Sequence, residues 1–409
     1  AAPGRSDGEE VRTWTADSGA TIDARYVESR GTSAVLEKPD GKRFQIALAR
    51  LSTQDRAYIE QLAFKALESE PPPPESYKAL IGKISPAIQC KNDPKWSYHL
   101  YLPSNFNLSR KWPVMFVMSP GGGKANTLKR YISGAEKNAW ILALSVQSKN
   151  GFEQSTAAMS AMVEDVQKEH PIDEKRLYAS GFSGGGRLAF ILAEQYKDRE
   201  FAGVLPCGAG ATRADLWRDT VIYGLCGSNC FNRWDMACTK KILRNDFYLW
   251  FVPGAHIWAE SDSIADGISW LNGRYLKEEG QSSKLLKAEK HRYEKRQLVD
   301  IASLIDSDPE RAYRLASALE EAGVQSHHRT ALAANASKLR AMPNIQAYEK
   351  AEAAMHDLVD RYFGTDLMDY RNRNCPPALT TAAETLADTC NELKIASTIR
   401  KMGGPTKIP

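Results

Sequence analysis

The stretch YASGFSGGGRLAF, residues 178–190, places a serine between glycines where two apolar runs meet. Its centre, Gly181-Phe182-Ser183-Gly184-Gly185, fits the pattern Gly-x-Ser-x-Gly; an apolar run over 177–180 enters it and a helical pattern over 187–196 leaves it. This order is the context of a nucleophile elbow, which presents a serine at the end of a strand. Flanking glycines let the strand and the helix approach without Cβ clashes. The stretch predicts an α/β sheet with Ser183 as nucleophile, against the alternative of a serine in a flexible glycine-rich loop.

The surrounding segment, residues 79–278, alternates apolar runs with amphipathic stretches, which is typical of an α/β fold with a mostly parallel sheet. The predicted strands are 98–102, 114–118, 141–146, 177–180, 203–206, 221–225 and 247–252, with helices between them, as at 155–169 and 185–196. Only fourteen residues separate the strand ending at 206 from the one starting at 221. We therefore expect no large lid, and a site open to a bulky substrate.

Two different segments flank this core. Residues 11–63 read as short alternating strands, and the Asp40-Gly41 pair is a strong hairpin signal, so they predict a small β-barrel. Residues 64–78 contain ESEPPPPES, a semi-rigid proline-rich linker. Residues 279–409 predict helices throughout and hold no catalytic constellation, so the sequence supports only a helical C-terminal region.

Bulk properties exclude several classes of protein. With 409 residues the chain is too long for one growing core. Its net charge of +4 is small and its basic residues are dispersed, which argues against a nucleic-acid partner. No apolar stretch approaches the roughly 18 residues that cross a bilayer. The Ala-Ala start is what signal-peptide removal would leave, which predicts a secreted or periplasmic protein, although a trimmed chain would look the same.

A serine nucleophile needs a base, and chain order in this fold is serine, acid, histidine. His256 lies in FVPGAHIWAE, residues 251–260, directly after an apolar strand. The carboxyl ends of parallel strands are where such sheets build their sites, so His256 is predicted as the general base.

The acid should follow the strand 221–225, within CGSNCFNRWDMAC, residues 226–238. The position where Gly-x-x-Asp is usual holds Cys230, and a neutral thiol cannot hold an imidazolium as a carboxylate does. Asp235 is the nearest carboxylate in the same loop and is predicted as the acid. The alternative is a surface aspartate, with Asn229 or Asn232 orienting the histidine.

An oxyanion hole needs two backbone N–H groups. One is expected from Gly184, directly after the nucleophile. The other is expected from VMFVMSPGGGK, residues 114–124, where Pro120 has no N–H and the donor must be Gly121 or Gly122. Large aromatic side chains that could line an open cleft and stack on sugar or aromatic acyl groups are Trp217, Trp234 and Trp258, at least one of which we expect in the core.

Seven cysteines leave at least one thiol without an intrachain partner. We expect a disulfide that pins the acid loop, formed by Cys207 or Cys226 with Cys230 or Cys238, while Cys375 and Cys390 bracket a short helical stretch; reduced structural cysteines in a cytosolic protein are the alternative. The spacing fits no ordinary zinc pattern and no histidine is near, so neither a metal nor a cofactor is predicted.

The N-terminal segment resembles the SH3-like homology domain first described in an actin-assembly adaptor and found fused to bacterial secreted enzymes. The residues that carry the resemblance are the opening Arg12-Thr13-Trp14-Thr15, the Asp40-Gly41 hairpin and the closing Leu48-Ala49-Arg50-Leu51-Ser52.

The central segment, about residues 90–275, resembles secreted α/β-hydrolase esterases of the polyhydroxybutyrate-depolymerase and feruloyl/acetylxylan-esterase type. The blocks are YHLYLPSNFNLSRKWPVMFVMSPGGG, PIDEKRLYASGFSGGGRLAF and PGAHIWAE…GISWLN, with matching residues Asp173, Arg176, Gly181, Ser183, Gly185, Gly254, His256 and Trp258. This implies hydrolysis of carboxylic esters through an acyl-serine intermediate. The chain departs from the pattern twice: Ser119-Pro120 stands where His-Gly usually opens the oxyanion loop, and Cys230 stands at the acid position.

The leading hypothesis is therefore a serine esterase that acts on a polysaccharide-linked or polymeric ester without a cofactor. The first alternative is a catalytically impaired hydrolase-fold protein that binds carbohydrate or another surface. The second is a serine peptidase, although no group that would recognise a peptide terminus stands out in the sequence.

Overall fold

The computed structural model describes residues 11–30, 33–52, 54–56, 58–59, 75–196, 201–211, 219–243, 246–279, 282–324, 326–362, 381–382, 384–385 and 387–389. The chain divides into two compact units, one of residues 1–72 with 278–292 and the other of residues 73–277 with 293–409. The domain boundaries expected from the sequence stay predictions. Each unit has its own core.

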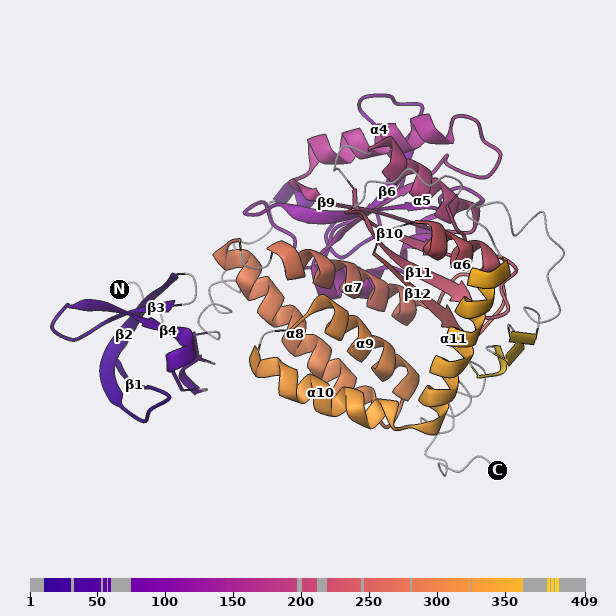
Figure 1. The fold of residues 1–409 in the computed structure, drawn as a ribbon. Helices are drawn as coiled ribbons and strands as arrows, with labels where there is room; N and C mark the ends of the chain where they lie inside the picture. The colour runs from indigo at the N-terminus through magenta and orange to yellow at the C-terminus, as the bar shows by residue number, and fades with distance from the viewer. Residues whose placement is uncertain are drawn as a thin grey trace. The chain divides into compact units, whose positions relative to one another are not determined.

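The first unit is built on a small antiparallel sheet (Figure 1). Its strands follow the order β1 (Arg12–Thr15), β2 (Thr21–Arg30), β3 (Ser33–Glu37) and β4 (Arg43–Ala47), and the short 3-10 helix η1 (Leu48–Arg50) follows. Trp14 is fully buried, and its indole N–H donates to the Ala24 carbonyl at 2.8 Å. The Asp40-Gly41 turn joins β3 to β4, and Gly41 adopts a φ of +83°, which favours glycine. The hairpin expected from the sequence is thus present.

The second unit contains an eight-stranded sheet in the order β12-β11-β10-β9-β7-β8-β6-β5. The strands β7 to β12 run parallel, whereas β5 and β6 pair antiparallel at one edge. Their bounds are β5 (Ile88–Gln89), β6 (Ser97–Tyr101), β7 (Trp112–Met118), β8 (Ile141–Ser145), β9 (Ile172–Phe182), β10 (Phe201–Cys207), β11 (Val221–Gly227) and β12 (Phe247–Val252). A mostly parallel sheet with this strand order, with helices between its parallel strands, is the α/β-hydrolase fold, as the sequence predicted.

Helices cover both faces of this sheet (Figure 1). Helices α4 and α5 lie on one face and α7 on the other. The bounds are η2 (Glu75–Tyr77), α2 (Ala125–Leu128), α3 (Ile132–Asn138), α4 (Ser155–Glu169), α5 (Gly184–Gln195), α6 (Arg233–Ile242) and α7 (Ser261–Glu279). Because both faces are covered, the central strands are buried along their length, and every residue of β7 and β8 is buried.

The helices α8 (Lys284–Leu304), α9 (Pro309–Ala322), α10 (Ser326–Arg340) and α11 (Pro343–Tyr362) follow the sheet in the chain. Two of them share its core rather than forming a loose appendage. Tyr348 of α11 stacks on Trp250 of β12 with ring centroids 4.9 Å apart, and Tyr313 of α9 contacts the same indole at 5.9 Å. The sequence predicted the helices but not this packing.

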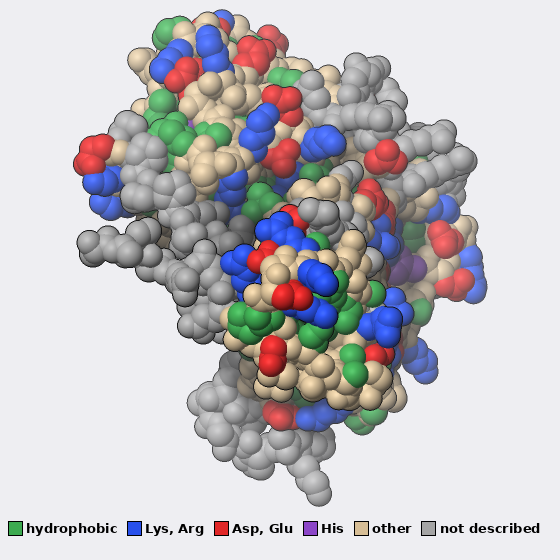
Figure 2. Space-filling model, turned by 90° about the vertical axis from the view of Figure 1, so that its left-hand side faces the viewer, with side chains coloured by type: hydrophobic (Ala, Val, Ile, Leu, Met, Phe, Trp, Pro, Cys, Tyr) green, Lys and Arg blue, Asp and Glu red, His purple; other side chains and the backbone are tan. Residues whose placement is uncertain are grey.

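Charges on the surface are mixed. On the face drawn in Figure 2, basic and acidic side chains lie next to one another. Among the described residues, no helix has the length and apolar content needed to cross a membrane.

Candidate active site

Ser183 sits on a strained turn between β9 and α5, with φ +53° and ψ −121°. A non-glycine residue at positive φ is held only where its surroundings impose that conformation. Here its N–H donates to the Cys207 carbonyl of β10 at 2.9 Å. A Cβ on Gly181 would lie 2.4 Å from a backbone oxygen of α5, and one on Gly185 would lie 2.3 Å from the Met118 carbonyl. The two glycines therefore permit the sharp turn that exposes the serine.

His256 lies in the loop after β12, and its Nε2 is 2.8 Å from Ser183 Oγ. The imidazole is half-buried between two phenyl rings, with Phe182 at 4.7 Å and Phe231 at 4.0 Å between ring centroids. The structure thus brings together the serine and the histidine that the sequence singled out, although they stand 73 positions apart in the chain.

The other imidazole nitrogen faces a cysteine. Cys230 Sγ lies 3.0 Å from His256 Nδ1 and accepts a hydrogen bond from the Asn232 backbone N–H at 3.3 Å. The Cys226 thiol also donates to it, and this hydrogen bond is the largest influence that lowers the pKa of Cys230, to about 6, against the opposing effect of burial. The hydrogen bonds with His256 and Asn232 lower it further.

Asp235 does not occupy the place predicted for it. It lies in the first turn of α6, with a side chain only 2% exposed. One oxygen accepts from Arg187 Nη2 at 2.6 Å and from the Gly210 N–H at 3.0 Å. The prediction that Asp235 orients His256 is therefore corrected: its carboxylate serves an ion pair between α6 and α5.

The side chains of Asn229 and Asn232, the alternatives to Asp235, are not hydrogen-bond partners of His256 Nδ1 either. Asn232 directs its side-chain amide to the Gly208 carbonyl at 2.8 Å, while its backbone N–H serves Cys230. Asn229 donates its backbone N–H to the Gly254 carbonyl at 2.9 Å. Both residues tie the loop after β11 to its neighbours.

The three amides expected at the oxyanion hole have different surroundings. The Gly122 N–H closes a turn onto the Ser119 carbonyl at 3.2 Å and is thereby engaged. Among the backbone hydrogen bonds of the described turns, loops and caps, no carbonyl accepts the N–H of Gly121 or of Gly184. Gly121 is exposed, whereas Gly184 is buried and Asn150 Oδ1 packs against it, since a Cβ on Gly184 would lie 1.5 Å from that oxygen. The loop of Gly121 packs against the start of α5, because a Cβ on Gly185 would also meet the Ser119 nitrogen at 2.9 Å.

The three tryptophans expected along a cleft have different surroundings. Trp258 is half-buried beside the site, with Phe182 at 5.2 Å and Tyr131 at 6.2 Å between ring centroids. Trp234 is only 8% exposed and belongs to the hydrophobic core, so its predicted place in a cleft is corrected. Trp217 lies outside the described residues.

The predicted disulfide in the acid loop is not formed. The cysteines within the described ranges are buried and form no disulfide, namely Cys90, Cys207, Cys226, Cys230 and Cys238. Cys375 and Cys390 lie outside those ranges. Among the same described residues, no group of three His, Cys, Asp or Glu side chains could hold a metal ion.

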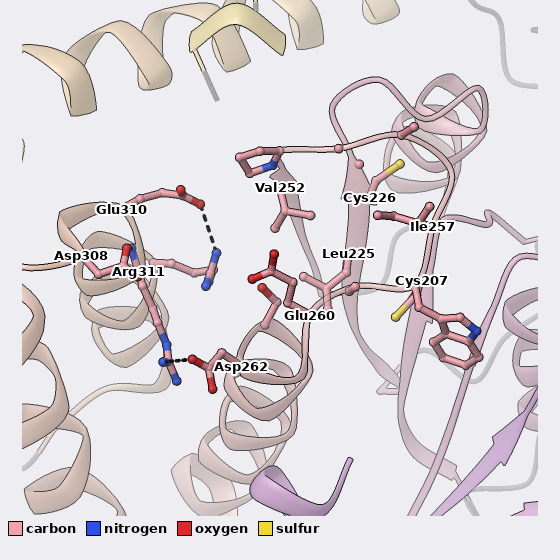
Figure 3. Close-up of a pocket in the computed structure, with 18 residues that line it drawn as sticks. Cys207, Leu225, Cys226, Val252, Ile257, Glu260, Asp262, Asp308, Glu310 and Arg311 are labelled. Atoms are coloured by element: carbon pink, nitrogen blue, oxygen red, sulfur yellow. Dashed lines mark hydrogen bonds and ion pairs between the residues drawn. The ribbon is translucent and has the colours of Figure 1, made fainter. Parts of the chain in front are cut away.

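A cavity of about 240 Å³ lies next to the histidine loop (Figure 3). Neither Ser183 nor His256 is among its walls; they come from the ends of β10, β11 and β12, from residues 253–255 and 257–260, from the start of α7, and from Asp308 and α9. Arg311 and Arg314 stand on the α9 side, paired with Asp262 at 2.6 Å and with Glu310 at 3.4 Å respectively. The cavity reaches Cys226, the thiol that donates to Cys230.

Comparison with known proteins gives a family for the N-terminal segment: residues 4–67 match SLA1 homology domain 1. The SH3-like resemblance seen in the sequence is thereby confirmed. The comparison with curated proteins gives no match.

Several solved structures are similar to part of this chain. They include S-formylglutathione hydrolase (FrmB) from Staphylococcus aureus, with 16% identity and a TM-score of 0.37 over 46% of this chain and 96% of that one. Est1E from Butyrivibrio proteoclasticus has 12% identity and a TM-score of 0.38 over 46% and 96%. The feruloyl esterase module from Clostridium thermocellum, solved with sinapinate, has 16% identity and a TM-score of 0.36 over 48% and 92%.

Proposed function

We propose that this protein is a serine hydrolase that cleaves carboxylic esters through an acyl-serine intermediate. The observation that carries the proposal is the 2.8 Å contact between His256 Nε2 and Ser183 Oγ on a strained elbow. A serine hydroxyl is a weak nucleophile until an adjacent base takes its proton, and this pair has the required reach.

Each step then has a group to perform it. Ser183 Oγ attacks the ester carbonyl while its proton passes to His256 Nε2. The backbone amides of Gly184 and Gly121 bind the negative charge that develops on the carbonyl oxygen. The protonated histidine gives its proton to the leaving alcohol, and water, activated by the same imidazole, releases the acid.

We infer an acyl group with apolar or aromatic character on a polysaccharide-linked or polymeric ester. Two large apolar side chains beside the histidine are exposed, Phe231 at 65% and Ile257 at 66%. Trp258 directly follows Ile257 in the histidine loop. Such exposed aromatic and aliphatic groups offer contact area for an acyl chain or a phenyl ring. Secretion of the protein stays a prediction of its sequence.

Hydrolysis of p-nitrophenyl acetate and butyrate by the purified full chain, beside Ser183→Ala, tests the proposal. We expect turnover by the parent, none by the variant, and labelling of the parent alone by a fluorophosphonate probe. A folded parent that neither turns over nor labels would refute the proposal and favour the reading as a binding module.

A further inference from the structure

We propose that Cys230, as a thiolate, takes the place that a carboxylate occupies in serine hydrolases and orients His256 for catalysis. The proposal rests on the proposed function of the Ser183–His256 pair. It makes Cys230 a positioning residue, because its sulfur acts through the imidazole and does not reach the reacting ester.

The contacts place one group at each end of the imidazole ring. Ser183 Oγ lies 2.8 Å from Nε2 and Cys230 Sγ lies 3.0 Å from Nδ1. Within the described part of the chain these are the hydrogen-bond partners of the two ring nitrogens, and neither is a carboxylate. Cys230 is 1% exposed, so water does not compete for this contact. Whatever fixes the histidine at Nδ1 must therefore come from this sulfur.

The protonation state of the sulfur decides which tautomer the histidine adopts. A neutral thiol that donates to Nδ1 leaves the ring proton on Nε2, where it points at Ser183 and cannot accept the hydroxyl proton. A thiolate accepts from Nδ1–H and leaves the Nε2 lone pair free for the serine. It also places a negative charge beside the imidazolium that forms during attack. Only the thiolate form is productive.

The loop after β11 is built to hold a thiolate. The sulfur receives hydrogen bonds from the Cys226 thiol and from the Asn232 N–H, besides the one from His256. Burial raises the pKa of Cys226 well above its usual value, so this neighbour keeps its proton and remains a donor. The pKa of Cys230 is correspondingly lowered to about 6.

The remaining charges near the two thiols come from α6 and from the cavity that reaches Cys226, whose charged walls are Glu260, Asp262, Asp308, Glu310, Arg311 and Arg314. Arg233 donates to the Cys230 carbonyl at 3.0 Å, and its positive charge acts on Cys226 together with the opposing negative charge of Asp235. The Asp235 charge is compensated by Arg187 at 2.6 Å. No uncompensated carboxylate therefore faces the sulfur from the described part of α6.

The pH dependence of activity follows from these groups. The productive state has a thiolate at Cys230 and a neutral imidazole at His256. Activity should therefore rise with pH as this pair loses the one proton that keeps the thiol neutral or the imidazole charged. The apparent pKa values of the profile belong to the pair and not to either residue. Removing the donor in Cys226→Ala destabilises the thiolate. We expect the rising limb of the kcat/KM profile to move to higher pH in this variant.

The decisive experiment compares Cys230→Ser, Cys230→Asp and the control Cys238→Ala in the full chain, with folding checked by circular dichroism and urea unfolding. Cys238 is a buried thiol of α6 that lies outside the site. In a trypsin-type triad a neutral replacement of the acid lowers kcat about 10⁴-fold. We expect kcat of Cys230→Ser to fall at least about 100-fold with little change in KM, and Cys230→Asp to recover to within about tenfold of the parent.

A second readout does not depend on turnover. The ultraviolet absorbance of a thiolate should appear in the parent between weakly acidic and neutral pH, and should be missing from Cys230→Ser. A folded Cys230→Ser with parental kcat, a Cys230→Asp no better than Cys230→Ser, or a parent without thiolate absorbance would each overturn the proposal. A parent that fails to hydrolyse and to label at Ser183 would instead overturn the proposed function.

Discussion

Replacing Asp235 with asparagine separates a structural carboxylate from a catalytic one. The carboxylate is 2% exposed and touches Arg187 and the Gly210 N–H. Removing one partner of a buried ion pair costs about 3–5 kcal/mol of stability because the other charge is left uncompensated. Two features reduce the cost here: the Arg187 side chain is 22% exposed and reaches water, and the asparagine oxygen still accepts from Gly210.

We therefore expect Asp235→Asn to lower the free energy of unfolding by about 2–3 kcal/mol. Urea unfolding followed by tryptophan fluorescence measures this change. The kcat/KM of the folded enzyme should change less than about tenfold, which is 1.4 kcal/mol of transition-state stabilisation. Arg187→Gln and the double variant complete a cycle, and the pair should show a coupling energy on the order of 1–3 kcal/mol.

The opposite pattern would refute this reasoning. A loss of activity on the order of 10⁴-fold with unchanged stability is what neutralising the acid of a triad produces. That result would mean that Asp235 reaches His256 in the working enzyme, and it would remove the role proposed for Cys230.

Three further predictions concern the elbow and the helices. Because Ser183 has a positive φ, Ser183→Gly should have a free energy of unfolding about 0.5–2 kcal/mol greater than that of Ser183→Ala in urea unfolding, while both variants lack activity. Equal stability of the two variants would contradict the backbone strain at this position. Gly185→Ala should fail to give soluble folded chain, since its Cβ would lie 2.3 Å from a carbonyl oxygen of β7, whereas Gly121→Ala, with nothing within 4 Å of its Cβ, should fold normally. Tyr348→Ala should cost about 3–5 kcal/mol in urea unfolding by removing the ring that stacks on Trp250, and a cost below about 1 kcal/mol would show that α11 is not part of the core.

The elbow and the base could be predicted from the sequence because local patterns encode them. A strand run, Gly-x-Ser-x-Gly and a helix in succession specify the turn at Ser183, and a histidine directly after an apolar strand falls at the carboxyl edge of the sheet. Chain order then pairs Ser183 with His256, which the structure places 2.8 Å apart.

The packing of the C-terminal helices could not be predicted in this way. Their helical pattern is visible in the sequence, but the partner of a buried ring depends on which distant surfaces meet. Trp250 on β12 accepts Tyr313 and Tyr348 from two different helices, and no local signal links these three positions. At least one of the three tryptophans was expected in the core, but no local signal identified Trp234 as that residue.

Asp235 was predicted as the acid because a carboxylate usually holds the imidazole of a triad, although Cys230 stands at the usual acid position in the sequence. β11 ends at Gly227, whose Cβ would lie 2.3 Å from the Ala255 carbonyl, so this strand end packs tightly against the histidine loop. The residue three positions later, Cys230, is thereby placed at the imidazole. Asp235 comes five residues further on, after α6 has begun, and the helix turns it towards α5.

The same close packing explains why a cysteine can serve at that position. A thiol in an apolar pocket alone would stay protonated, since burial raises its pKa. At Cys230 a second buried thiol, a backbone N–H and the imidazole itself converge on the sulfur and outweigh burial. Substituting the supporting thiol in Cys226→Ala leaves every atom of the Ser183–His256–Cys230 chain in place while removing one donor. A kcat/KM profile that shifts to higher pH in this variant, with parental activity at the top of the profile, would tie catalysis to the charge on the sulfur rather than to its shape; a profile that stays in place would assign the sulfur a packing role only.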